Sequence, residues 1–455
     1  MKRTLIMTAP FNTKSGYGEH ARDIFYSLYD LERFDIKLID TPWGDTPRDY
    51  LDPENKRHKL ILDRLVYDLG TITQQPEIYV DCRIPNEFET HGKFNIGITA
   101  GVETTAVSSN WLENCNKMDL VLVPSQHSKD GFVNSTFDKM QNLPNGQKQK
   151  IGELKLEKPM EVLFEGANLD IFKPLKHDEL VTDVSKSLND IKEDFCFLFV
   201  GMWTQGGKGE DRKNIYNLLK YFYETFANKK NPPALVLKTS GAHHSVIDRE
   251  TIKQKIGEVK SMFPSYIQLP QVYLLHGHLN DDEMNELYNH PKIKAMVSLT
   301  HGEGFGRPLL EATMTGLPVI ASAWSGHKDF LNSQNCLMIG GDLVDVPKSM
   351  HWENIIIPQS KWFEVGKDEV YNAFRFAVKN KYDIKQNAKK LMKINRNKFS
   401  HDRMTDKLGE MLDKHLTDLP QQVSVKLPEL KKTKIKLPSL TKVKTEDKKL
   451  QTEGA

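Results

Sequence analysis

Residues 298–321 decide the fold, and they read Ser-Leu-Thr-His-Gly-Glu-Gly-Phe-Gly-Arg-Pro-Leu-Leu-Glu-Ala-Thr-Met-Thr-Gly-Leu-Pro-Val-Ile-Ala. The mostly apolar run Ala295–Leu299 predicts a buried strand, and Pro308 suits the first turn of a helix that Gly316 ends. Pro318–Ala321 predicts the next strand. A strand, a glycine-rich loop, a helix and a second strand indicate a βαβ unit in a parallel sheet.

The loop of this unit has the chemistry of an anion site. Gly302, Gly304 and Gly306 leave backbone N–H groups free to bind a diphosphate, which the positive end of the helix dipole also favours. Glu303 and Glu311 are anionic, so we expect them to bind hydroxyl groups instead of phosphate. The combination suits a ligand in which a sugar or a ribose is joined to a diphosphate.

The same alternation of strands and helices extends along most of the chain. Strand-like and amphipathic helix-like stretches follow one another in the first half, and the pattern begins again at the continuous apolar run Phe195–Val200. A last amphipathic segment, Arg403–Leu416, ends it. We therefore predict two α/β domains of similar size, each with a mostly parallel, doubly wound sheet.

Length and composition fit this organisation. The chain has 455 residues, enough for two or three domains, and its 38% hydrophobic and 27% charged residues are typical of a soluble globular protein. The longest non-polar run, Phe195–Trp203, is far shorter than the ~20 residues that span a bilayer. We find no secretory signal, and the four cysteines lack C-x-x-C spacing, so we predict a cytoplasmic protein without disulfides or a structural zinc site.

The basic residues are concentrated at the end of the chain. The net charge is +2, but residues 420–455 contain nine Lys, no Arg and four acidic residues, which leaves the rest of the chain mildly acidic. Such a body is not suited to wrapping nucleic acid. The preferred interpretation of the tail is a disordered segment. Its repeated segments Val425–Lys431 and Ile435–Thr441 leave open a second one, a docking peptide for a protein partner or an acidic surface.

A second glycine motif lies near the N-terminus. Gly16, Gly18 and Ala21 form a G-x-G-x-x-A set between a strand and a helix, and Asp40 ends the next strand-like run. Taken alone, these residues suggest a dinucleotide site. However, the seven residues Ala9–Ser15 separate the strand from Gly16, whereas a dinucleotide turn follows its strand directly. A phosphate-facing loop of another kind is therefore the preferred interpretation.

Several segments together carry a family resemblance. The Glu303 to Glu311 segment resembles the E-x7-E motif of the retaining GT-B glycosyltransferases of the large "group 1" family, also called family 4. Further segments resemble the same family, in the expected order: Ser15–Gly18, Asp119–Ser125, Val162–Pro174 with Asp170 shifted by one position, Phe199–Gly201, Arg212–Asn214 and Trp324–Phe330. The resemblance covers roughly residues 1–416.

The resemblance implies a GT-B fold, in which two facing Rossmann-like domains are joined by a C-terminal crossover helix. We expect an acceptor-side domain at 1–172, a linker at 173–194, a nucleotide-sugar-binding domain at 195–400, the crossover helix at 401–419 and the disordered basic tail at 420–455. The implied reaction is transfer of a sugar from a UDP- or GDP-linked donor to an unidentified hydroxyl acceptor, with retention of the anomeric configuration. No cofactor and no metal are expected.

The resemblance also assigns roles to residues. Glu303 and Lys213 are the expected catalytic residues, Glu303 holding the sugar and Lys213 the leaving diphosphate. Glu103 and His20 are candidates on the acceptor side. The expected donor-binding residues are Gly16, Gly18, Arg212, Lys213, Gly304, Phe305, Gly306, Arg307 and Glu311, with Glu311 on the ribose hydroxyls.

The chain departs from the family pattern at one place. Many relatives have an Arg directly after the glycine of the F-V-G segment, where this chain has Met202 and Trp203. Lys213, helped by Arg212, is left to bind the diphosphate, and Lys208 in the glycine-rich insert is a possible substitute for the missing cation.

Two other functions stay open at this point. One is a non-catalytic GT-B-like scaffold that acts through its Lys-rich tail, and the other is an NAD-dependent oxidoreductase that uses the N-terminal glycine motif.

The pair His243-His244 suggests a metal site, but no further ligands lie at useful spacing, so a surface pair is preferred.

Overall fold

The structure, a computed structural model, describes residues 2–143, 147–203, 206–241 and 244–417. Its first six-stranded sheet has the order β2-β1-β3-β4-β5-β8, and every neighbouring pair in it is parallel. The strands are β1 (Arg3–Ala9), β2 (Phe34–Asp40), β3 (Ile78–Cys82), β4 (Phe94–Ile98), β5 (Leu120–Val123) and β8 (Met160–Val162). β3, β5 and most of β1 are buried along their length, as expected for parallel strands that helices cover on both faces.

The second six-stranded sheet is also parallel and has the order β11-β10-β9-β12-β13-β14. Its strands are β9 (Cys196–Val200), β10 (Ala234–Lys238), β11 (Val272–Leu275), β12 (Ile293–Ser298), β13 (Val319–Ser322) and β14 (Leu337–Ile339). After β9, the chain adds β10 and then β11 on one side of β9, and it next crosses to the other side, where β12 pairs with β9. In such sheets, ligands bind beyond the carboxyl ends of the strands at this change of direction, which here lies between β9 and β12.

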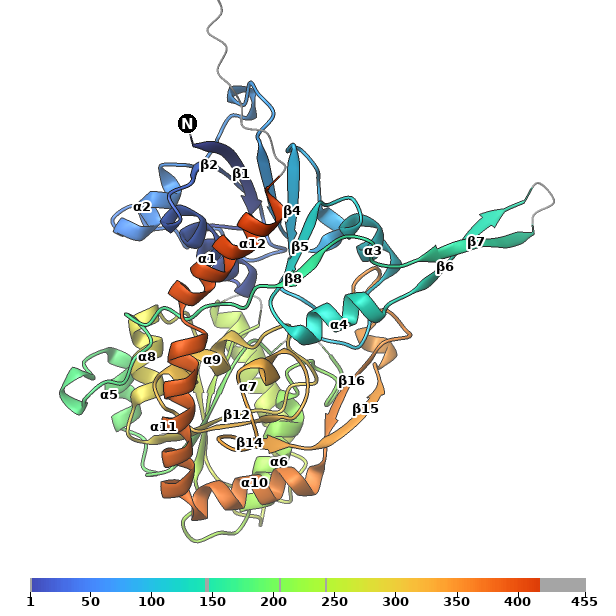
Figure 1. Ribbon diagram of the computed structural model, residues 1–455. Helices are drawn as coiled ribbons and strands as arrows, with labels where there is room; N and C mark the ends of the chain where they lie inside the picture. The colour runs from blue at the N-terminus through green and yellow to red at the C-terminus, as the bar shows by residue number, and fades with distance from the viewer. Residues whose placement is uncertain (1, 144–146, 204–205, 242–243, 418–455) are drawn as a thin grey trace, which may run out of the picture. The chain divides into compact units, whose positions relative to one another are not determined.

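Helices connect the strands, as the sequence predicts (Figure 1). They are α1 (Gly16–Asp30), α2 (Lys56–Leu62), α3 (Ser109–Cys115), α4 (Gln126–Asn134), α5 (Asp183–Asn189), α6 (Ile215–Phe226), α7 (Val246–Lys260), α8 (Asp281–Asn289), α9 (Arg307–Met314), α10 (Lys367–Lys379), α11 (Lys381–Lys398) and α12 (His401–His415). Ser15 and Ser125 cap α1 and α4 by accepting hydrogen bonds from backbone N–H groups. Pro308 lies in the first turn of α9.

The last helix returns to the first sheet. α11 follows the second sheet, whereas α12 packs on α1, where Arg33 forms an ion pair with Asp413. Backbone hydrogen bonds join Ala167 to Phe399 and His401 at the turn between the two helices. The predicted two-domain, doubly wound α/β fold with a crossover helix is confirmed, and the predicted disordered tail lies outside the described residues.

Two antiparallel pairs were not predicted from the sequence. β6 (Phe137–Asn142) and β7 (Lys148–Leu154) form a ribbon that extends away from the first sheet in Figure 1. β15 (Gly341–Asp345) pairs with β16 (Lys361–Val365) beside the second sheet. No helix among the described residues is both long and apolar enough to cross a membrane.

Candidate active site

The glycine-rich loop between β12 and α9 packs against the loop that follows β4. A Cβ atom on Gly302 would lie 1.9 Å from the carbonyl oxygen of Glu103, and one on Gly304 would lie 2.0 Å from that of Ala100. Any side chain at these positions would separate the two loops. Gly302 and Gly304 therefore serve a close backbone approach, whereas Gly306, with φ of 97°, adopts the left-handed conformation from which α9 begins.

Glu303 is buried and paired in this loop, with 7% of its surface exposed. Lys213 donates to both of its carboxylate oxygens, at 2.6 and 2.8 Å, and Arg212 donates to Oε2 at 3.3 Å. Burial alone would raise the pKa of Glu303, but the charges of Lys213 and Arg212 outweigh it and lower that pKa to about 2. A loop glutamate between two glycines would ordinarily face solvent, but tertiary packing buries Glu303 here.

Arg212 and Lys213 precede α6 and are not a solvated helix start. Asn214, with φ of 56°, separates them from the helix, and both side chains turn toward the loop after β12. Arg212 donates to the carbonyl oxygen of Gly302 at 2.9 Å and lies 3.7 Å from the carboxylate of Glu103. Burial lowers the pKa of Lys213, although Glu303 opposes that shift. These two cations and two carboxylates form one cluster of formally zero charge.

Glu311 belongs to a second charged cluster, one turn into α9. Its carboxylate accepts from Arg307 Nε at 2.9 Å and from the Tyr288 hydroxyl at 3.2 Å. Arg307 also pairs with Asp23, and lies 3.4 Å from Glu19, on α1. Burial raises the pKa of Glu311. Arg307, expected to bind the donor, is thus held by three carboxylates and joins the second sheet's α9 to α1.

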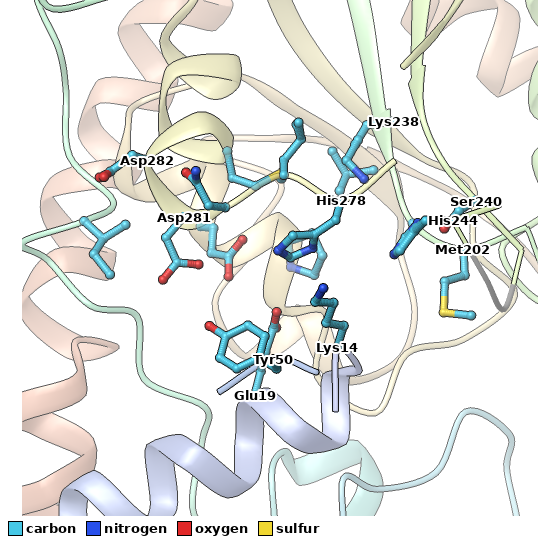
Figure 2. Close-up of a pocket in the computed structure, with 18 of the residues that line it drawn as sticks. Lys14, Glu19, Tyr50, Met202, Lys238, Ser240, His244, His278, Asp281 and Asp282 are labelled. Atoms are coloured by element: carbon cyan, nitrogen blue, oxygen red, sulfur yellow. The ribbon is translucent and has the colours of Figure 1, made fainter. Parts of the chain in front are cut away.

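Glu311 is one of the residues that line a cavity of about 670 Å³. Figure 2 shows this cavity with several other lining residues labelled. Residues that follow the carboxyl ends of β9, β10 and β11 form one wall, and residues from the start of α1 and the 49–58 segment form the other. The polar and sulfur-containing side chains of the lining include those of Lys14, Glu19, Met202, Lys238, Thr239, Ser240, His244, His278 and Glu311. Among the described residues, Glu311 is the expected site carboxylate that lines this cavity, whereas Glu303 and Lys213 lie outside its lining.

The remaining predicted residues have mixed positions. Gly16 is exposed at the start of α1, and Gly18 is buried, where a Cβ would lie 2.4 Å from the carbonyl oxygen of Thr13. His20 is buried on α1, and burial lowers its pKa to about 4, so its ring is neutral near pH 7. The ring of Phe305 lies in the core, with its centroid 5.0 Å from that of the Phe330 ring. Only the backbone of Phe305 is therefore left to contact a ligand.

The features behind the alternative functions have structural explanations. Asp40 accepts from the backbone N–H of Asn12 and forms an ion pair with Arg48, so it orders the loop after β1. Lys208 is exposed. His244 lines the cavity, His243 lies outside the described residues, and the described part of the chain has no group of three or more His, Cys, Asp or Glu side chains placed to hold a metal ion.

Sequence reasoning missed several ionisable residues in and near the cavity. Lys238 is the last residue of β10, and its place at the carboxyl end of a buried strand was the available signal. Glu19, which lines the cavity, and Asp23, which does not, lie on α1 and contact Arg307. Lys14 and His278 are on loops, where the sequence carries no comparable pattern.

Comparisons with known proteins support the fold and the family resemblance. Residues 267–356 match the family model of the glycosyl transferases group 1. No curated protein matches the chain. Similar solved structures include HepE of Anabaena in complex with UDP and glucose, with 11% identity, 90% of this chain and 100% of that chain covered, and a TM-score of 0.56.

Two further solved structures resemble this chain to a similar degree. Sucrose-phosphate synthase from Thermosynechococcus elongatus has 12% identity, with 91% of this chain and 99% of that chain covered and a TM-score of 0.59. A UDP-forming α,α-trehalose-phosphate synthase from Burkholderia xenovorans has 11% identity, with 92% and 100% covered and a TM-score of 0.58. At such identities the likeness shows the fold alone. The chain therefore has the GT-B fold, and its resemblance to the group 1 glycosyl transferases is confirmed by the family match over residues 267–356.

Proposed function

We propose that this protein is a glycosyltransferase that moves a sugar from a nucleoside-diphosphate sugar to a hydroxyl acceptor, with retention at the anomeric carbon. The observation that carries the proposal is the 670 Å³ cavity at the carboxyl ends of β9, β10 and β11, with Glu311 in its wall. Its volume is in the range of cofactor sites. Its lining includes Val200 and Gly201 at the end of β9 and Pro308 and Glu311 of α9, which follows β12, so the cavity reaches the change of direction at which doubly wound sheets bind nucleotides. The complexes of HepE with UDP and with UDP-glucose support a UDP-linked donor.

In this proposal each charged cluster has a separate task. Glu311 binds the ribose hydroxyls, because a carboxylate accepts strong hydrogen bonds from hydroxyl groups. Glu303 holds the transferred sugar, and its ion pair positions Lys213 beside the leaving diphosphate. Lys213, Arg212 and the N-terminus of α9 stabilise the negative charge that develops as the bond to the sugar breaks. The departing phosphate takes the proton of the acceptor hydroxyl on the same face of the sugar, which gives retention.

The acceptor side of the proposed site is formed by the first sheet and its helices. Glu103 reaches the Arg212 cluster from the loop after β4, and His20 lies on α1. The four cysteines are buried and unpaired, which agrees with a cytoplasmic location as part of the proposal.

Nucleotide binding and product analysis test this function together. Calorimetric titration of the full chain with UDP, GDP and NAD is expected to show binding of UDP or GDP and none of NAD. Incubation with a panel of nucleotide sugars is expected to release the nucleoside diphosphate, and NMR of the product should show the donor's anomeric configuration. Binding of NAD would favour the oxidoreductase, absence of all binding would favour the scaffold, and an inverted product would refute retention.

A further inference from the structure

Lys238 brings an isolated cation into the cavity wall. It ends β10, and Figure 2 shows its ammonium group on the same side of the cavity as His278 and His244. The ammonium donates to the carbonyl oxygen of Gly277 at 2.7 Å, its one recorded acceptor among the described residues. Since a lysine ammonium has three N–H donors, two are available to a ligand.

The strand order places Lys238 away from the expected diphosphate. The helix end at α9 follows β12, and Lys213 follows β9, whereas Lys238 ends β10 on the far side of β9. Neighbouring strands lie about 4.8 Å apart, so β10 is roughly 10 Å from β12. A nucleotide with its diphosphate at α9 and its ribose at Glu311 therefore extends its base toward the ends of β10 and β11. This step rests on the proposed function.

Lys238 is the one Lys or Arg side chain at this end of the described cavity lining, because Lys14 lies on the opposite wall. Ser240 and Thr239 carry hydroxyl groups, which rotate to donate or accept. Burial lowers the pKa of His244 to about 4 and also lowers that of His278, so both rings are neutral near pH 7, each with one donor and one acceptor nitrogen. A lysine, in contrast, donates only.

We propose that Lys238 contacts the base of the donor nucleotide at C4 of a pyrimidine or C6 of a purine, and selects a base with an oxygen at that position, uracil or guanine, over one with an amino group there, cytosine or adenine. The exocyclic oxygens of uracil and guanine accept hydrogen bonds, whereas the amino groups of cytosine and adenine donate them and would oppose the ammonium. Protein–DNA contacts show the same chemistry, since lysine pairs with O6 and N7 of guanine. The role differs from that of the family's diphosphate-binding cations.

If Lys238 binds the base, nucleotide affinity should depend on the protonation of Lys238 and therefore on pH. Burial lowers the pKa of Lys238 to about 8, and Glu19 on α1 and Glu283 on α8 oppose the shift. The other ionisable groups that face this end are Lys14 on the opposite wall, His244 before α7 and His278 after β11. A base oxygen favours the protonated ammonium, so nucleotide affinity is highest below about pH 8 and falls as the ammonium loses its proton above that pH.

The test compares four nucleotides on three forms of the full chain. UDP, GDP, CDP and ADP are titrated calorimetrically into wild type, Lys238→Met, and Lys14→Met as the matched loss of a cavity lysine. Wild type should bind UDP or GDP at least about 10-fold more tightly than CDP and ADP, the scale of one base-reading contact. Lys238→Met should reduce this preference to about 3-fold or less, whereas Lys14→Met should change the four affinities by similar factors.

Each other outcome has its own meaning. If none of the four nucleotides binds wild type, the proposed function fails. If wild type binds without base preference, or if Lys238→Met keeps the preference, the function stands and the role of Lys238 is wrong. Equal weakening of all four by Lys238→Met would also overturn it, because that result assigns Lys238 to the diphosphate. If Lys238→Met does not fold, the pH dependence of wild type decides: the affinity for UDP or GDP must fall between pH 7.5 and 9, and an unchanged affinity would overturn the role of Lys238. In a folded Lys238→Met protein this fall should disappear.

Discussion

Lys213 Nζ lies 2.6 Å from Oε1 of Glu303, so these two residues form a buried ion pair. The pair joins the start of α6 to the loop before α9, which are 90 residues apart in the sequence. Removing one member of a buried pair leaves the other charge uncompensated and destabilises a protein strongly. A loss of activity in Glu303→Ala could therefore come from unfolding as well as from lost catalysis. Glu303→Gln keeps the shape of the side chain and separates the two effects.

Glu303→Gln is expected to lower kcat by ~10²-fold or more, the scale for removing a positioned electrostatic group. The amide keeps an oxygen for Lys213, but it no longer accepts charge-assisted hydrogen bonds from the sugar. Steady-state kinetics with a nucleotide-sugar donor measures the effect, and thermal melting shows whether the variant is folded. Glu353→Gln, at an exposed position, is the matched control and should keep wild-type rates. Wild-type kcat in folded Glu303→Gln would refute the catalytic assignment.

Glu311→Gln should act mainly on donor binding. Ribose contacts are made in the ground state and the transition state alike, so KM for the nucleotide sugar should rise roughly 10-fold, the scale of a hydrogen bond to a charged group, with a smaller change in kcat. The same kinetics separates the two constants. An unchanged KM would show that the ribose lies elsewhere in the cavity.

The sequence was sufficient to predict the architecture because the signals were local. Apolar runs such as Phe195–Val200 are long enough to be read as strands buried on both faces, and Gly316 and Pro318 mark the end of one element and the start of the next. The ribbon of β6 and β7 was missed for the opposite reason. Its residues are polar and mostly exposed, so no apolar alternation indicates a strand.

The residue types of the candidate site could be predicted, but their pairing could not. The spacing of Glu303 and Glu311 is a pattern within one segment. The contact of Arg307 with Asp23 joins residues 284 positions apart, and it depends on how α1 and α9 pack. Burial of Glu303 likewise comes from tertiary structure, because a glutamate between glycines has the local sequence of an exposed turn.

Acidification should destabilise the protein in part through His20. Burial lowers the pKa of His20 from 6.5 to about 4, so the unfolded chain binds a proton that the folded chain excludes. The neutral ring contributes stability that is fully present above pH 6.5 and is lost as the pH falls toward 4, up to about 3 kcal/mol. His20→Gln should therefore lose less Tm than wild type between pH 7.5 and 4.5. His177→Gln, at an exposed position, is the control, and equal losses in wild type and His20→Gln would contradict the prediction.

Transfer activity should survive chelation of divalent ions. In the proposed mechanism hydrogen bonds from Lys213 and Arg212 and the N-terminus of α9 stabilise the diphosphate, so no metal ion is needed for that task. Donor hydrolysis and transfer are compared before and after dialysis against EDTA. Loss of activity that returns when Mg²⁺ or Mn²⁺ is added back would show that the leaving group depends on a metal.

Arg307→Met should destabilise the fold more than the loss of a surface arginine does. Asp23, Glu19 and Glu311 surround the guanidinium, and its removal leaves buried carboxylates without their cation, at a cost of about 3–5 kcal/mol. Because Arg307 joins α9 to α1, the loss should also increase hydrogen exchange at both helices. Arg249→Met is the matched control, since its exposed pair with Glu250 is worth at most about 1 kcal/mol. If both variants melt at the wild-type Tm, the Arg307 cluster does not stabilise the contact between the two helices.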